Sequence, residues 1–139
     1  FPYTTLFRSL YPRTLHPLHA VFLAGIIPLF LGALLSDIAY ARTYEIQWSN
    51  FASWLVVGGL AFGAVALLFA LVGAVRARRG FYLLLLLATW VVGGINALVH
   101  ARDAWGIMPT APILSALAFV LACLATWSGF AGSRWGAAA

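Results

Sequence analysis

The sequence predicts an all-α integral membrane protein, an antiparallel up-down bundle of four transmembrane helices with both termini in the cytoplasm. Three observations lead to this fold class. Of the 139 residues, 64% are hydrophobic and 8% are charged, and a soluble fold of this size has no means of burying so much apolar surface. Four apolar runs are each close to the roughly 20 residues that cross a bilayer as a helix. Arginine is distributed unequally between the links that join them.

The four expected spans follow one another with little chain between them. They comprise residues 19–38, 51–75, 81–101 and 111–132. The links read AYARTYEIQWSN, RARRG and RDAWGIMPT. Because links this short join only helices that run in opposite directions, the spans are expected to alternate up and down within one domain, residues 14–139.

All eight basic residues are arginine, and their positions determine the predicted orientation. With the N-terminus inside, six arginines are cytoplasmic and two are outside, as the positive-inside rule requires. The inner six are Arg8, Arg13, Arg76, Arg78, Arg79 and Arg134, and the outer two are Arg42 and Arg102. The net charge of +5 therefore indicates topology. It does not indicate a nucleic-acid partner, because the sequence has no basic stripe interleaved with aromatic residues.

The first thirteen residues are expected to lie outside the bundle. Phe1–Ser9, FPYTTLFRS, resembles a translated sequencing-adaptor peptide and has no helical period. We therefore assign residues 1–13 no function.

Small residues recur along the second span at intervals of four, three, four and three. They are Gly59, Gly63, Ala66, Ala70 and Gly73. This spacing places them on one helix face, and the first two form a GxxxG step that permits close helix contact. The face is expected to pack inside the bundle, with packing between chains as the alternative.

Two histidines stand directly before the first span. His16 and His19 share one face of a helix that begins at Pro17, a favoured first-turn residue. The pair could ligate haem b or a quinone, bind lipid headgroups, or have a structural role at the helix start. No metal site is predicted here, because a metal normally takes at least three protein ligands.

A second polar group lies at the opposite membrane face. Asp37 comes near the end of the first span, and Asn96 and His100 lie one turn apart near the end of the third. The first and third spans run in the same direction, so a carboxylate–imidazole pair is geometrically reasonable. The alternatives are a polar clamp between helices, a proton or electron site, and the polar path of a small transporter.

The separation of the histidines restricts the haem hypothesis. A six-coordinate haem needs two axial histidines at one depth, but the pair before the first span and His100 are separated by about 20 helical residues, or roughly 30 Å. Any haem would have to be five-coordinate, use another second ligand, or bridge two chains.

Other chemistry finds little support in the sequence. GxSxG, P-loop, HExxH and EF-hand patterns are absent. The acids Asp37, Glu45 and Asp103 are too few for most hydrolases. The single cysteine, Cys123, lies within a span and has no basic neighbour to activate it. The sequence thus favours a protein that is not an enzyme.

The stretch Leu15–Leu60, LHPLHAVFLAGIIPLFLGALLSDIAYARTYEIQWSNFASWLVVGGL, resembles the bacterial membrane family called domain of unknown function 2231 (DUF2231). The matching positions are His16, Pro17, Leu18, His19, Pro28, Gly32, Asp37, Tyr40 and Trp54. The chain departs from the pattern at Ala20, where the family often has proline. It also lacks an acid at the end of the second span, which counts against any activity that needs that carboxylate.

The resemblance implies a multi-pass protein of the bacterial inner membrane. Some members of the family look fused to electron-transfer modules, so we expect a non-catalytic membrane domain or an accessory subunit of an electron-transfer assembly. The alternatives are a haem b or quinone carrier that uses His16 and His19, and a small transporter that uses Asp37, Asn96 and His100. The expected partners are the lipid bilayer and a second copy or a larger membrane complex.

Overall fold

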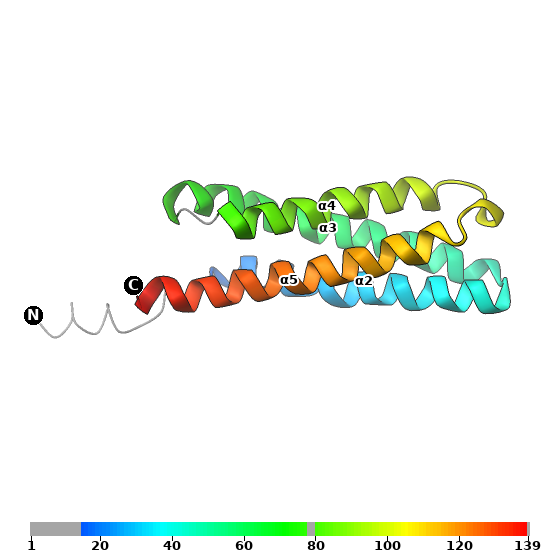
Figure 1. The fold of residues 1–139 in the computed structure, drawn as a ribbon, viewed down its shortest axis with the longest axis horizontal. Helices are drawn as coiled ribbons and strands as arrows, with labels where there is room; N and C mark the ends of the chain where they lie inside the picture. Colours follow the sequence, from blue (N-terminus) through cyan, green and yellow to red (C-terminus); the bar gives the residue numbers. More distant parts are fainter. Residues whose placement is uncertain (1–14, 78–79, 139) are drawn as a thin grey trace, which may run out of the picture.

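The computed structural model describes residues 15–77 and 80–138, and this part of the chain is helical with no strand. Its elements are α2 (Pro17–Thr43), α3 (Ile46–Ala77), α4 (Gly80–His100), the short 3-10 helix η1 (Ala104–Gly106) and α5 (Thr110–Ala138). The four α-helices lie side by side along one long axis (Figure 1). Each is long and apolar enough to cross a membrane. The predicted all-α class with four candidate spans is therefore confirmed.

Some sequence features fall outside this description. The adaptor-like segment and the rest of residues 1–13 lie outside the described residues, as do the arginines at positions 78 and 79.

The chain between α2 and α3 is shorter than the twelve-residue link expected from hydropathy. Only Tyr44 and Glu45 separate the two helices. Tyr44 ends α2 in the left-handed conformation (φ 55°, ψ 20°), and its backbone N–H bonds to the carbonyl of Tyr40 at 2.8 Å. The hydroxyl of Thr43 donates to the carbonyl of Ala39 and accepts the N–H of Glu45. These local bonds let both helices continue beyond their apolar spans, which hydropathy alone does not predict.

Each long helix packs against two neighbours. The helix α2 contacts α3 and α5, and α4 contacts the same two, so α2 and α4 face each other across the bundle. The α2–α3 connection and η1 lie at one end of the bundle, here called the η1 end. The start of α2 and the end of α5 lie at the other, here called the Pro17 end (Figure 1).

The main core combines large side chains from α2 with small residues from its neighbours. Phe30 is almost completely buried. A Cβ added to Gly59 of α3 or to Gly93 of α4 would lie 2.9 Å or 3.0 Å from the Phe30 ring, so these glycines let three helices approach one aromatic side chain. Other buried members of this core are Leu23, Ile26, Ala66, Ala70, Leu86, Ala118, Ala122 and Ala125.

The small-residue face of α3 mostly points into the chain's own interior. Gly59, Gly63, Ala66 and Ala70 are buried, whereas Gly73 is half-buried and has open space where a Cβ would lie. The outward faces of all four helices carry large apolar side chains instead. Examples are Val21, Leu35, Trp54, Leu68, Leu84, Leu98, Ile113 and Leu124. Such a surface fits contact with lipid.

Candidate functional site: two polar clusters between α2 and α4

The predicted polar residues near the η1 end form one connected network, here called the Asp37 cluster. Asp37 Oδ1 lies 2.8 Å from His100 Nε2, and Asp37 Oδ2 accepts the Ser115 hydroxyl at 2.5 Å. Ser115 Oγ in turn accepts Asn96 Nδ2–H at 2.8 Å. The other ring nitrogen, His100 Nδ1, lies 2.9 Å from the backbone oxygen of Asn96. The network thus connects α2, α4 and α5.

The bonds of the Asp37 cluster determine where its hydrogens lie. A carbonyl oxygen only accepts, so His100 Nδ1 carries a hydrogen. Ser115 donates to Asp37 and accepts from Asn96, so its hydroxyl hydrogen is also assigned. One hydrogen then occupies the gap between Asp37 Oδ1 and His100 Nε2, because two bare acceptors at 2.8 Å would repel each other. The pair is either an ion pair or a neutral acid and base that share this hydrogen.

The cluster is shielded from solvent. Asp37, Asn96 and Ser115 have no exposed surface, and His100 has 8%. A charge so deeply buried is costly unless it is paired and hydrogen-bonded, as Asp37 is here. One group is left over: Asn96 Oδ1 is buried and has no hydrogen-bond partner among the described residues.

Local sequence explains the position of His100. It is the last residue of α4, and the Asn96 carbonyl one turn earlier has a second lone pair that can accept a side-chain donor. A histidine one turn after Asn96 can turn its ring back to that carbonyl. This bond orients the ring so that Nε2 faces α2.

A small apolar group covers the Asp37 cluster on the side of the η1 end. It consists of Tyr40, Val99, Ile107 and Ala111, all buried. Tyr40 follows Asp37 by one turn of α2, and it also lines a cavity of about 580 Å³ at the η1 end. The other residues that line this cavity are Tyr44, Ala104, Trp105 and Met108. The Tyr44 and Trp105 rings stack with centroids 6.4 Å apart.

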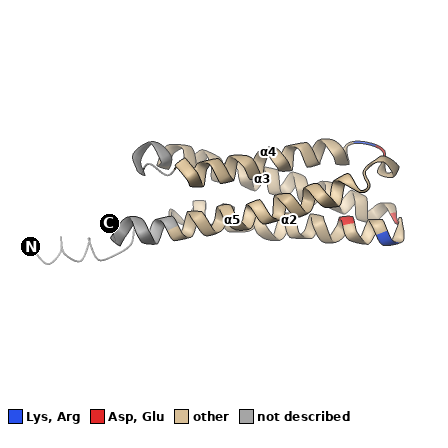
Figure 2. Cartoon of the chain, viewed as in Figure 1, with Lys and Arg blue, Asp and Glu red and all other residues tan. Residues whose placement is uncertain are grey.

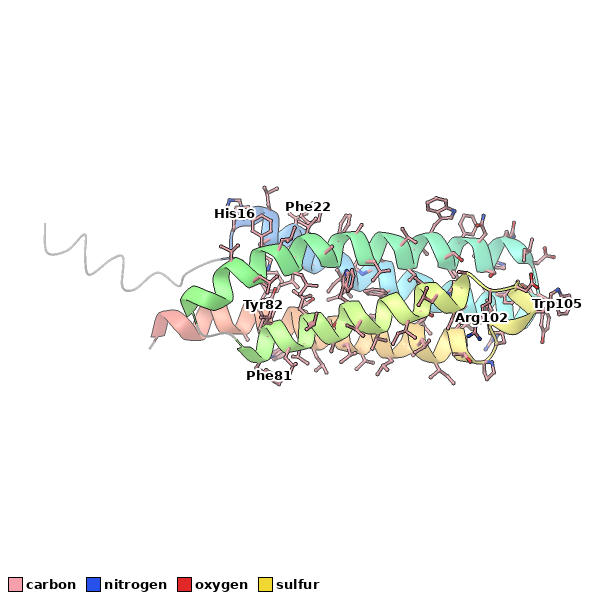
Figure 3. All side chains as sticks on the ribbon, turned by 90° about the horizontal axis from the view of Figure 1, so that it is seen from above. His16, Phe22, Phe81, Tyr82, Arg102 and Trp105 are labelled. Carbon is pink, nitrogen blue, oxygen red and sulfur yellow. The ribbon has the colours of Figure 1, made fainter. Side chains whose placement is uncertain are left out.

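The predicted histidines near the Pro17 end belong to a second group, here called the His19 cluster. Buried His19 has its Nε2 2.8 Å from the Tyr82 hydroxyl of α4. The rings of His16 and His19 both stack on Phe69 of α3, with centroids 5.7 Å and 5.5 Å apart. Figure 3 shows His16 and Tyr82 at this end of the bundle, and Arg102 and Trp105 at the other.

His16 is exposed and acts as the N-cap of α2. Its Nδ1 accepts the backbone N–H of Leu18 at 3.2 Å, so the hydrogen of the neutral ring lies on Nε2. A haem iron bound at Nε2 would move that hydrogen to Nδ1, where it would face the Leu18 N–H. At His19, ligation through Nε2 would displace the Tyr82 hydroxyl. Axial ligation would therefore cost a hydrogen bond at either histidine.

The two clusters are related by position. His19 pairs with Tyr82 and Asp37 pairs with His100, and both pairs are 63 residues apart in the sequence. His19 and Asp37 are separated by five helical turns, or about 27 Å along the axis, and so are Tyr82 and His100. One face of α2 is thus bonded to one face of α4 at two positions. This agrees with the sequence-based expectation that His100 lies far from the pair His16 and His19.

The structure brings together only part of what was predicted as sites. Asp37, Asn96 and His100 meet in one network, whereas His16 and His19 share only a ring partner. Sequence reasoning missed Ser115, Tyr82 and Phe69. The signal for Ser115 was a lone hydroxyl in the apolar run ILSALAF. The signal for Tyr82 was its spacing of eighteen residues from His100, equal to that of His19 from Asp37. Among the described residues, no group of three or more His, Cys, Asp or Glu could hold a metal ion.

One comparison with known proteins gives a match. A family model described as "Predicted membrane protein (DUF2231)" matches residues 15–137. No match was found among curated proteins or solved structures.

Proposed function

Because the chain belongs to the DUF2231 family of predicted membrane proteins, we propose that it is a non-catalytic four-helix domain of the bacterial inner membrane that serves as an accessory subunit of an electron-transfer assembly. The observation that carries this proposal is the mutual bonding of interior polar groups across α2 and α4 at both ends. Bonds of this kind fix helix register. They suit a domain that holds its shape inside a larger assembly.

The apolar outer surface supports membrane assembly. Every α-helix exposes large apolar side chains, and such faces can be covered by lipid, by a second copy of this chain, or by helices of a partner. In a bilayer, helix association relies on close packing and polar contacts, because lipid is as apolar as leucine.

The proposed topology is an up-down-up-down bundle with both termini in the cytoplasm. Contacts along α2 and α3 support the alternation: Gly32 lies against Leu55, and Gly59 lies against Phe30. The residues with described charged side chains gather toward the η1 end (Figure 2). They are Asp37, Arg42, Glu45, Arg102 and Asp103. With two arginines at that end and six elsewhere in the sequence, the positive-inside rule favours an external η1 end.

Topology is tested by cysteine labelling in intact cells. In a Cys123→Ser background, Glu45→Cys should react with a membrane-impermeant maleimide before permeabilisation, and Arg134→Cys only after it. The opposite labelling pattern would show that the η1 end faces the cytoplasm and would contradict the proposed orientation.

The accessory role is tested by purification from native membranes. The tagged chain should migrate as part of a complex whose visible absorption comes from a redox partner, and the chain expressed alone should be colourless even after haem supplementation. The chain expressed alone could instead show a Soret band that is lost in His16→Ala or His19→Ala and kept in His100→Ala. That result would favour the haem carrier over the accessory subunit. Migration in native membranes without a redox partner would contradict the accessory role.

Contacts at the Pro17 end bear on the carrier hypothesis. The bonds of His16 and His19 count against haem ligation, as described above. They leave a quinone or a lipid headgroup as the more suitable ligand, because the neutral His16 ring presents an N–H donor at Nε2. The transporter hypothesis has less support, since the interior between the two clusters is lined by apolar residues such as Ile26, Phe30 and Leu86.

A further inference from the structure

We propose that the Asp37–His100 pair binds one exchangeable proton, which enters from the cavity beside Tyr40 and is delivered by a water molecule held at Asn96 Oδ1. The ligand of this site is therefore a proton, which a water molecule carries to it. This proposal does not rest on the accessory role, because proton binding and assembly with a redox partner can fail separately.

The hydrogens of the Asp37 cluster can be placed from its bonds. His100 Nδ1–H faces a carbonyl, one Asn96 amide hydrogen faces Ser115, and Ser115 donates to Asp37, so the hydrogen whose owner is open lies between Asp37 Oδ1 and His100 Nε2. Binding adds H⁺ from water to the carboxylate and neutral imidazole and changes the charge of the pair from −1 to 0. Release returns H⁺ to water and restores the negative charge.

The Asp37 cluster also contains one amide oxygen without a hydrogen-bond partner among the described residues. Asn96 has no exposed surface, yet its Oδ1 lacks a donor. A buried amide oxygen without a hydrogen bond is costly, and such groups in native proteins usually bind ordered water. Asn96 also bonds to both Ser115 and the His100 ring. A water at Oδ1 would therefore lie beside the pair that takes up the proton.

The cavity at the η1 end lies on the side of the Asp37 cluster that faces the surface. Tyr40 belongs to the buried group above the Asp37 cluster and also lines the cavity at the η1 end. It lies one turn after Asp37 on the same face of α2. Tyr40 thus lines the cavity from the turn of α2 that follows Asp37. Toward the Pro17 end the described core contains large apolar side chains such as Ile26, Phe30 and Leu86, so the cavity at the η1 end is the entrance that we propose.

The surroundings contain few other titratable groups. The helix α2 contributes Asp37 and Tyr40, α4 contributes His100, and α5 contributes the hydroxyl of Ser115. The α3 side offers the buried hydroxyl of Ser49, and the remaining charges near this end are exposed: Arg42, Glu45, Arg102 and Asp103. The shared proton therefore belongs to the buried acid–base pair.

Loss of the proton has a mechanical consequence. Without it, Asp37 Oδ1 and His100 Nε2 are two acceptors 2.8 Å apart, and they must separate. Because the two atoms belong to α2 and α4, proton release is expected to loosen the bundle at the η1 end. The bond between His19 and Tyr82 at the other end is expected to persist.

The test is ¹⁵N NMR of the full chain in lipid nanodiscs, with histidine labelled. The chain has three histidines, which permits assignment by substitution. Between about pH 4 and pH 10, a range that spans histidine titration, His100 should change from the bridged form to the neutral Nδ1–H form. In Asp37→Asn, the amide supplies a permanent donor to Nε2, so His100 should remain in the neutral Nδ1–H form at every pH.

The entrance is tested by exchange with D₂O. Ala104→Trp should fill the cavity and slow deuterium exchange of the His100 ring several-fold. Ile113→Trp, which adds the same side chain to an exposed position on α5, should leave the rate unchanged. The His19 signal shows in each sample whether the variant is folded.

Three results would overturn the proposal. One is a wild-type His100 signal that does not respond to pH, and this measurement decides the question even if Asp37→Asn does not fold. Another is the same titration in wild type and in folded Asp37→Asn. The third is an exchange rate that Ala104→Trp leaves unchanged or that both tryptophan variants slow equally.

Discussion

The two ends of the bundle join the same pair of helices by different chemistry. At the Pro17 end, an imidazole bonds to a phenol, His19 to Tyr82. At the η1 end, an imidazole bonds to a carboxylate, and Ser115 and Asn96 extend that bond into a network. The first contact has no carboxylate, whereas the second needs one hydrogen that Asp37 and His100 share. Equal positions on α2 and α4 therefore do not imply equal strength or equal sensitivity to pH.

The largest expected effect comes from Asp37→Ala at the η1 end. It leaves His100 Nε2 and the Ser115 hydroxyl without their acceptor in a buried site, and breaking a buried pair costs about 3 kcal/mol or more. The free energy of unfolding in mixed micelles measures this loss. Asp103→Ala, an exposed acid near the same end, should change it by less than about 0.5 kcal/mol. Similar unfolding free energies for the two variants would show that the network does not stabilise the bundle.

Overpacking of side chains at the Pro17 end is expected to have the next largest effect on stability. In Gly129→Ala, the new Cβ would lie 2.7 Å from Leu23 Cδ2 and 2.9 Å from Tyr82 Cε2. The overpacking should cost about 1–3 kcal/mol. Gly94→Ala is the matched control, since nothing lies within 4 Å of its Cβ position. Equal melting temperatures for the two variants would contradict the packing described for this end.

Removal of one hydroxyl isolates the contact at the Pro17 end. Tyr82→Phe keeps the ring but loses the bond to His19, and hydrogen bonds between membrane helices average about 0.6 kcal/mol. The loss should therefore be several times smaller than that of Asp37→Ala. Tyr44→Phe, at an exposed tyrosine, serves as the control. A loss as large as that of Asp37→Ala would make the two ends equivalent.

The smallest expected effect concerns the start of α2. His16→Ala removes the side-chain acceptor for the Leu18 N–H at 3.2 Å, and loss of an N-cap costs about 0.5 kcal/mol at the low end of its range, which suits so long a bond. Faster amide exchange in the first turn of α2, with the rest of the chain unchanged, is the expected result. His16→Asn supplies another capping acceptor and should restore protection. Uniform destabilisation in His16→Ala would instead indicate a role in packing.

Much of the fold follows from the sequence because hydropathy and length are local properties. The four spans, the shared helix face of His16 and His19, and the meeting of Asp37 with His100 could each be argued from spacing. The short connection at Tyr44 and Glu45 could not, because it depends on a left-handed residue and on side-chain bonds of Thr43 that polarity does not reveal.

The site residues contributed by other helices were harder to predict from the sequence. Ser115 and Tyr82 became visible only once α4 and α5 were placed against α2, since a lone hydroxyl in an apolar helix can also bond to its own backbone. Thr89 does so, donating to the carbonyl of Leu85. Sequence spacing shows which residues share one face of a helix. Which hydroxyl of a neighbouring helix reaches the Asp37 carboxylate depends on how that helix is rotated about its own axis.

The most direct test of the unequal ends is a pair of double-mutant cycles. One cycle combines Asp37→Ala with His100→Ala, and the other combines His19→Ala with Tyr82→Phe, with unfolding free energies measured in the same micelles. We predict a coupling energy above about 1 kcal/mol at the η1 end and a smaller one at the Pro17 end. Additivity of Asp37→Ala and His100→Ala to within about 0.5 kcal/mol would show that this buried pair is not the stronger link between α2 and α4.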